Sequence, residues 1–251
     1  MKKILLLIIL ILAGGLILWN IKDSDWPNNP LDDQTTTQPN NQSAQFNFDA
    51  PKKSAHYESN TPAHGGVLPG VPINIVLDFN FDLHEISSIK IIHNGKDYGI
   101  GETVIDSNKL TMRRAMDEAS PDGVYRVEYN ACWPDRSCHD GYFQFAINQS
   151  LQEQATDLTG QDEVIIEMQY IAFALQAVRI SKGTTVTWKN LDQATHYVNT
   201  DSHPAHTYYP SQNSPALDID ETYALTFNEP GVYPYHCTAH ADVMKGIIIV
   251  K

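Results

Sequence analysis

Residues 231–246, GVYPYHCTAHADVMKG, gather three metal-binding side chains on one loop between two predicted strands. Cys237 offers a thiolate, His240 an imidazole three residues later, and Met244 a thioether four residues beyond that. One cysteine, two histidines and a weakly bound methionine are the ligand set of a type 1, or blue, copper site. His236 does not supply the second imidazole, because it alternates with Cys237 along a strand and should point away from the metal.

His196 is the candidate for the second imidazole. It lies in NLDQATHYV, residues 190–198, directly after a predicted strand at 184–189. A loop from a different strand pair can deliver it to the same end of a sandwich as Cys237. The alternative is a buried free cysteine beside a core-filling methionine, and the donor spacing argues against it. The sequence therefore predicts one copper ion with the ligands His196, Cys237, His240 and Met244.

The remaining histidines of the chain carry weaker signals. We interpret His203 and His206 as ordinary loop histidines, with capture of incoming copper as the alternative. His64, His84 and His93 have no spacing that indicates a ligand role, and we interpret them as surface residues.

Residues 162–251 contain short predicted strands without helical periodicity, which is typical of a β-sandwich. The strands are expected at 164–173, 177–180, 184–189, 222–227, 231–236 and 246–250. The region resembles the cupredoxins, the plastocyanin and azurin group, in Phe173, in VRISKGTTVTW at 178–188 and in GVYPYHC at 231–237. The resemblance implies a Greek-key sandwich in which the same four residues hold a type 1 copper for electron transfer.

Residues 55–148 are expected to form an earlier all-β unit, also a sandwich. Runs rich in β-branched and aromatic residues predict strands at 71–81, 86–93, 124–130 and 142–147. Asn94-Gly95 and Pro121-Asp122-Gly123 are turn signals. The one short helix of this unit is expected near 112–119.

Cys132 and Cys138 end one predicted strand and begin the next, with a connecting turn between them. Cysteines that face each other across a hairpin can lie close enough for a disulfide, and an exported protein meets an oxidising compartment. We predict a disulfide, which would contribute roughly 2 kcal/mol by loop closure. Free thiols and metal ligands are the alternatives.

The earlier unit resembles the CopC-like copper-resistance domain, an exported Ig-type β-sandwich. The resemblance lies in AHYESNTPAHG at 55–65, GVYRV at 123–127 and HDGYFQF at 139–145. In that family a histidine at the mature N-terminus and an Asp-x-His element hold copper(II). The resemblance makes His56 and His139 candidates for a second copper site, although Ser137 stands where the family has its aspartate. The alternative is that both are surface or hydrogen-bonded histidines.

The first 19 residues begin with two lysines and continue as an apolar run, which is the layout of a signal peptide or a signal anchor. We favour the uncleaved anchor, because Ala13-Gly14-Gly15 is followed by further apolar residues. The lysines would stay cytoplasmic and everything after the run would lie outside, in the periplasm or at the cell surface. Cleavage would give a secreted protein. Residues 20–54 read as a flexible polar tether and 149–161 as a linker between the two sandwiches.

The net charge bears on partners. The chain has 17 basic and 30 acidic residues, a formal charge of −13, which excludes nucleic acid as a natural partner and favours redox partners with a basic docking face. We expect no enzyme activity, because one thiolate cannot build a dinuclear purple copper centre and no His-x-His clusters supply a trinuclear one.

We therefore expect an electron carrier between redox proteins. The main alternative is a copper-binding protein for resistance, storage or delivery. A weaker one is a subunit that feeds electrons to a nitrite or oxygen reductase.

Overall fold

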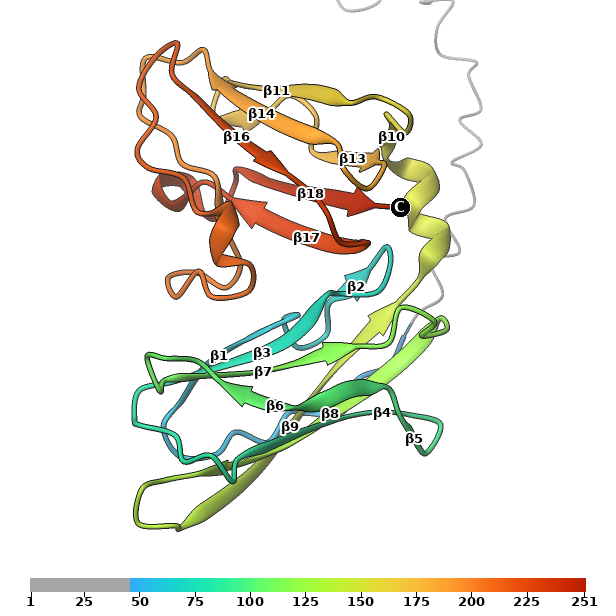
Figure 1. Cartoon of the computed structure of the whole chain (residues 1–251), viewed down its shortest axis with the longest axis vertical. Coiled ribbons are helices and arrows are strands. Elements are labelled where there is room, and N and C mark those ends of the chain that lie inside the picture. The colour runs from blue at the N-terminus through green and yellow to red at the C-terminus, as the bar shows by residue number, and fades with distance from the viewer. Residues whose placement is uncertain (1–45) are drawn as a thin grey trace, which may run out of the picture. The chain divides into compact units, whose positions relative to one another are not determined.

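The structure is a computed structural model that describes residues 46–251, so the predicted anchor at 1–19 and the tether segment 20–45 lie outside the described residues. Residues 46–251 form one compact unit that contains two β-sandwiches, drawn one above the other in Figure 1. No helix in this part of the chain is long and apolar enough to cross a membrane. The all-β prediction is confirmed for these residues.

The first sandwich pairs a four-stranded sheet with a five-stranded sheet. The four-stranded sheet has the order β1 (Tyr57–Thr61), β3 (Asn74–Phe79), β7 (Thr111–Met116) and β6 (Gly99–Ile105). The five-stranded sheet has the order β2 (Val67–Leu68), β9 (Cys138–Ile147), β8 (Gly123–Cys132), β4 (Ser88–His93) and β5 (Lys96–Asp97). All neighbouring strands are antiparallel except β2 and β9.

Alternation along β8 shows why this part of the chain forms a sandwich. Tyr125, Val127 and Tyr129 are buried in one core, while the residues between them are partly or fully exposed, as expected for a strand with one face on the core. Asn94-Gly95 forms the predicted two-residue turn between β4 and β5, and both residues have positive φ. The disulfide between Cys132 and Cys138 is confirmed, at the end of the β8–β9 hairpin.

The helix expected near 112–119 is wrong, because Thr111–Met116 is the strand β7. Met112 and Met116 are buried in the core of the first sandwich, a spacing that suits either a helix turn or alternate strand positions. Hydrogen bonding with β3 on one side and with β6 on the other makes this segment a strand. One of these partners, β3, is distant in sequence, so a local pattern does not show the pairing.

The second sandwich pairs another five-stranded sheet with another four-stranded one. The five-stranded sheet has the order β10 (Thr156–Asp157), β13 (Ala177–Ile180), β18 (Lys245–Val250), β17 (Gly231–His236) and β15 (Asn199–Thr200). The four-stranded sheet has the order β12 (Ala172–Phe173), β11 (Glu163–Gln169), β14 (Thr185–Asn190) and β16 (Thr222–Thr226). Its core contains the fully buried Trp188, packed against Tyr223, Phe227 and Tyr235.

The single strand expected at 164–173 is instead a hairpin. It turns at Tyr170 and Ile171, whose φ values are 58° and 56°. A two-residue turn with positive φ at both positions normally contains Asn or Gly, so the sequence carries no signal for it.

Segments that read as linkers also have defined structure. The 3₁₀ helix η1 (Gln149–Gln154) joins the sandwiches, and β10 then pairs with β13. At the start of the described chain, the backbone of Lys52 pairs with Tyr142 of β9.

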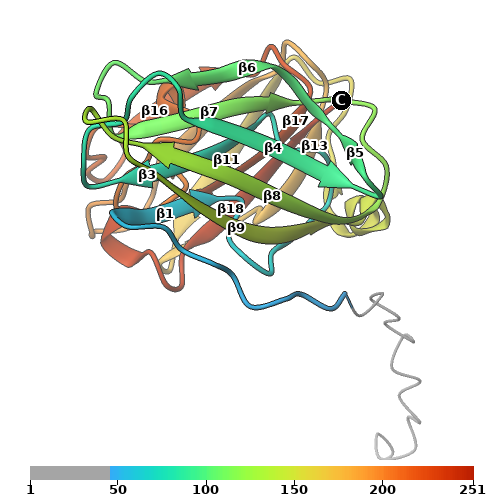
Figure 2. The same ribbon diagram turned by 90° about the horizontal axis from the view of Figure 1, so that it is seen from below.

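The sheet β1-β3-β7-β6 faces the second sandwich, as Figures 1 and 2 show from two directions. At one point of contact the backbone N–H of Val232 donates to the carbonyl of Val71 at 3.1 Å. The hydroxyl of the buried Tyr208 donates to the Val232 carbonyl at 2.7 Å and accepts from the N–H of Ile73 at 2.9 Å. Polar groups from both sandwiches therefore satisfy one another where the two meet.

Candidate metal centre

Cys237 directly follows β17, at the start of the 3₁₀ helix η3 (Thr238–His240). Its carbonyl accepts the N–H of His240 at 2.9 Å, and its own N–H donates to the carbonyl of Met244 at 3.0 Å. The N–H of Met244 donates in turn to the carbonyl of His240 at 2.9 Å. These bonds close the loop into a tight turn that buries Cys237 and Met244 completely.

A second loop, between β14 and β15, places His196 beside this turn. The buried Asn190 ends β14, and its amide donates to the carbonyls of Ala194 and Leu217 at 2.8 and 2.9 Å. The backbones of His196 and Leu217 also pair with each other. One buried amide therefore shapes the loop that delivers the histidine.

The three side chains converge. Sγ of Cys237 lies 3.6 Å from Nδ1 of His196 and 3.6 Å from Nδ1 of His240. A near-tetrahedral metal with bonds of about 2.3 Å to sulfur and 2.0–2.1 Å to nitrogen separates such donors by about 3.6 Å. The spacing thus fits one shared metal ion, and a thiolate with two imidazoles is a donor set that suits copper.

Hydrogen bonds hold the sulfur of Cys237 and the ring of His196 in position. The N–H of Tyr197 donates to Sγ of Cys237 at 3.3 Å. Nε2 of His196 lies 2.8 Å from Oδ2 of Asp192, and a proton held there leaves the lone pair on Nδ1, the nitrogen on the side of the sulfur. Such a partner on the far side of a ligating imidazole fixes its orientation and tautomer.

The carboxylate of Asp192 is itself fixed in place. Desolvation alone would raise its pKa, but the N–H of Ile171, the ring of His196 and the N–H of Tyr170 together lower the pKa below its usual value. Sequence reasoning noted Asp192 only as part of a motif, and its position four residues before His196 was the available signal.

The structure brings some of the predicted metal ligands together and leaves others apart. His196, Cys237 and His240 form one group of potential metal ligands. Met244 is buried in the same core as Cys237, and its role as axial ligand stays a prediction. His56 and His139 both pack near Trp133, with ring centroids 5.1 and 6.3 Å away. Neither belongs to a group of three potential ligands within residues 46–251.

A second group in the described part of the chain joins His203, His206 and His236. His236 points away from Cys237, as predicted, and its Nδ1 lies 3.0 Å from Oδ1 of Asp201. Burial, then the neighbouring His236 and His203, lowers the pKa of His206 to about 4. Sequence reasoning did not connect these three histidines.

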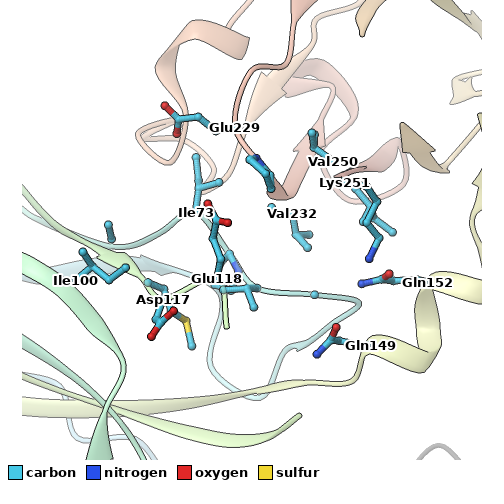
Figure 3. A pocket seen from close by; sticks show the side chains of 18 residues that line it. Ile73, Ile100, Asp117, Glu118, Gln149, Gln152, Glu229, Val232, Val250 and Lys251 are labelled. Carbon is cyan, nitrogen blue, oxygen red and sulfur yellow. The ribbon is translucent and has the colours of Figure 1, made fainter. Parts of the chain in front are cut away.

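A pocket of about 640 Å³ lies between the sandwiches (Figure 3). Ile73, Val232 and Val250 line it together with the charged Glu118 and Lys251. It contains neither group of potential metal ligands. The metal chemistry of the described residues therefore lies elsewhere.

Comparison with known proteins agrees with this chemistry. Residues 161–251 match the copper binding proteins of the plastocyanin/azurin family, and residues 57–148 match the CopC domain. Amicyanin-alpha of Methylorubrum extorquens is 35% identical over 86 residues, which cover 34% of this chain and 70% of that protein. Halocyanin of Natronomonas pharaonis is 38% identical over 103 residues, which cover 38% of this chain and 61% of that protein.

Amicyanin of Paracoccus denitrificans is 27% identical over 88 residues, and the match covers 35% of this chain and 65% of that protein. The chain thus spans less than two thirds of this amicyanin and of the halocyanin. A solved structure of an amicyanin mutant in the Cu(I) form is 26% identical, with a TM-score of 0.31, over 37% of this chain and 85% of that one.

The β-sandwich and its thiolate–imidazole cluster define a copper-binding protein of the electron-transfer type. The chain belongs to the plastocyanin/azurin family, with a CopC domain preceding the family's own domain, and its cofactor is copper.

Proposed function

We propose that this protein is an extracytoplasmic type 1 copper protein that carries single electrons between redox partners. The observation that supports this most is the convergence of Cys237, His196 and His240 at 3.6 Å spacing. We assign these three residues as copper ligands, with Met244 as the weak axial ligand. Bound copper supplies the one-electron change between its cuprous and cupric states.

The residues around the site hold the donor atoms still. Asp192 fixes the ring of His196, and the N–H of Tyr197 holds the sulfur. His196 and Cys237 are fully buried, which keeps water from their donor atoms. A donor set held in place in this way should move little on electron transfer, and fast transfer follows.

His240 is the one assigned ligand with partial exposure, so we assign its ring edge as the path for electrons. Exposed apolar residues lie close by, in the loop after β17 and in the turn between β11 and β12. Val243 is 69% exposed, and its N–H donates to the carbonyl of His240. Tyr170 and Ile171, 85% and 43% exposed, donate their N–H groups to Asp192 beside His196. We call Tyr170, Ile171 and Val243 the docking patch, which suits brief encounters with a partner whose surrounding face is basic.

Copper-loaded residues 46–251 should titrate reversibly with one electron and exchange electrons rapidly between molecules. Val243→Glu should slow self-exchange by about 10-fold or more, because a carboxylate in each docking patch repels its counterpart. NMR line broadening in mixtures of oxidised and reduced protein measures the rate.

Ile165→Glu is the matched control, since Ile165 is 63% exposed on β11 and outside the docking patch. It should leave the rate within about twofold. Equal slowing by both variants would count against the docking patch, and failure to titrate with one electron would count against the carrier function.

The alternative of copper binding for resistance, storage or delivery has support from the CopC domain at 57–148. It requires copper(II) at the first sandwich. Because both His56 and His139 lie near Trp133, bound copper(II) should quench the Trp133 fluorescence. We expect quenching in Cys237→Ser protein to disappear with His139→Ala and to persist with His84→Ala. Identical titration curves for these two variants would rule out a site at His139.

A further inference from the structure

Outside the thiolate site, His203, His206 and His236 form a compact imidazole cluster in residues 46–251. One ring nitrogen of each lies within 4.8 Å of the others, and the ring centroids are 5.1–5.5 Å apart. His236 is buried, His206 is partly buried and His203 is exposed. The cluster is therefore anchored in the protein at one side and open to solvent at the other.

The closest pair already has the spacing of two ligands on one metal. Nε2 of His206 lies 3.2 Å from Nε2 of His236. Two metal–nitrogen bonds of 2.0–2.1 Å at a near-tetrahedral angle separate their nitrogens by about 3.3 Å. His203 lies within 4.8 Å of the other two and needs to move inward by at most about 1.5 Å to reach this spacing, which its exposed position on the loop allows.

Asp201 orients His236 for this task. Nδ1 of His236 lies 3.0 Å from Oδ1 of Asp201, and an ionised carboxylate there accepts the Nδ1 proton. The lone pair of His236 is then on Nε2, the atom that faces His206. This carboxylate–imidazole arrangement is the one that usually supports a metal-bound histidine.

The histidine loop is also held from outside its own sandwich. Ser202 lies between Asp201 and His203, and its hydroxyl donates to Asp78 of the first sandwich at 3.1 Å. The hydroxyl of Thr207 donates to the same carboxylate at 2.8 Å. Both ends of the segment 202–207 are therefore fixed. A metal gains affinity where its ligands are already ordered.

One polar neighbour competes with a metal for the cluster. The hydroxyl of Thr238 lies 3.2 Å from Nε2 of His206, and it also accepts from the amide of Asn199 at 2.8 Å. A metal ion would displace only the first of these hydrogen bonds. The Thr238 hydroxyl keeps its bond to Asn199.

We propose that His203, His206 and His236 form a second metal site, which binds a borderline divalent ion such as copper(II) or zinc(II) with a fourth position open to solvent. Three imidazoles suit both ions, and copper(II) binds the more tightly of the two. The new site and the thiolate site are adjacent along the chain, because His236 directly precedes Cys237. They use opposite faces of the strand end, so the new site does not depend on the thiolate site being filled.

Metal titration of residues 46–251 tests the proposal. The Cys237→Ser protein, which lacks the thiolate, should bind zinc(II), and calorimetry measures this affinity. It should also bind copper(II), and the electron paramagnetic resonance signal of that copper should have an ordinary wide hyperfine splitting. His203→Ala and His206→Ala should each weaken binding at least about 100-fold, and Asp201→Asn by about 10- to 100-fold. His203 is exposed, so its variant should fold normally.

The double variant His56→Ala/His139→Ala is the control for the first sandwich, and it should leave this affinity unchanged. The proposal is overturned if His203→Ala and His206→Ala leave the zinc(II) affinity of the Cys237→Ser protein unchanged. It is also overturned if the copper(II) resonance signal is lost only in the double variant. In protein with Cys237 intact, the blue absorption should survive His203→Ala. If copper-loaded wild-type protein shows no blue absorption, that result contradicts the electron-carrier function. The zinc(II) affinities of His203→Ala and His206→Ala then still test the imidazole site.

Discussion

Replacing Cys237 with serine should abolish the intense visible absorption of copper-loaded protein and its narrow copper hyperfine splitting. Both properties arise from the copper–thiolate bond, and Sγ of Cys237 lies 3.6 Å from Nδ1 of each of the two histidines. A serine hydroxyl is a hard oxygen donor that copper(I) disfavours. Copper(I) affinity should fall by more than the 10- to 100-fold typical for loss of a supporting partner.

The other two cysteines provide a matched control. Cys132 and Cys138 form a disulfide in the first sandwich, so the double variant Cys132→Ser/Cys138→Ser should keep the full blue absorption and redox titration. Circular dichroism would check that each variant is folded. Retention of the blue band in Cys237→Ser, with the fold intact, would refute our assignment of the thiolate ligand.

Replacing Asp78 with alanine should destabilise residues 46–251 by about 3 kcal/mol or more. Asp78 is 5% exposed, in β3. Its carboxylate accepts from the hydroxyls of Ser59 and Thr111 in the first sandwich and of Ser202 and Thr207 in the second. A hydrogen bond to a charged group contributes about 1.5–3 kcal/mol, and a buried hydroxyl left without a partner adds its own cost. Urea unfolding measures the change.

Asp82→Ala is the control, because Asp82 is an exposed aspartate in the loop after β3, and its loss should change stability by less than about 0.5 kcal/mol. Hydrogen exchange should also show faster opening of residues 201–208 in Asp78→Ala, since two of the four donors hold that loop. Similar unfolding free energies for Asp78→Ala and Asp82→Ala would show that the carboxylate does not link the sandwiches.

The strand predictions succeeded where the pattern was local. Buried and less buried residues alternate along β13 and β14, and the sequence predicts both strands within one residue. It also predicts β17, whose turn residues and aromatic content mark its bounds. The expected helix failed at β7 because Met112 and Met116 fit either period, and only pairing with β3 and β6 decides between them. The missed turn at Tyr170 and Ile171 lacks the usual residues.

Residues close in sequence made the thiolate loop recognisable. Cys237, His240 and Met244 lie within one short turn, so their spacing alone indicates the donor set. His196 could be named as a candidate because it follows a predicted strand. Its 3.6 Å approach to the sulfur depends on Asn190, which bonds Leu217 27 residues away.

The all-β class, most of the longer strands and the local donor spacing could be predicted from the chain itself, because they depend on residues that are neighbours in sequence. Folding alone brought His206 within 3.2 Å of His236 across 30 residues, and joined Asp78 to Thr207 across 129. Such contacts depend on how β3, β17 and the loop after β15 come together in space. No short stretch of sequence predicts that arrangement. The imidazole cluster and the hydrogen bonds between the sandwiches are therefore visible only in the folded protein.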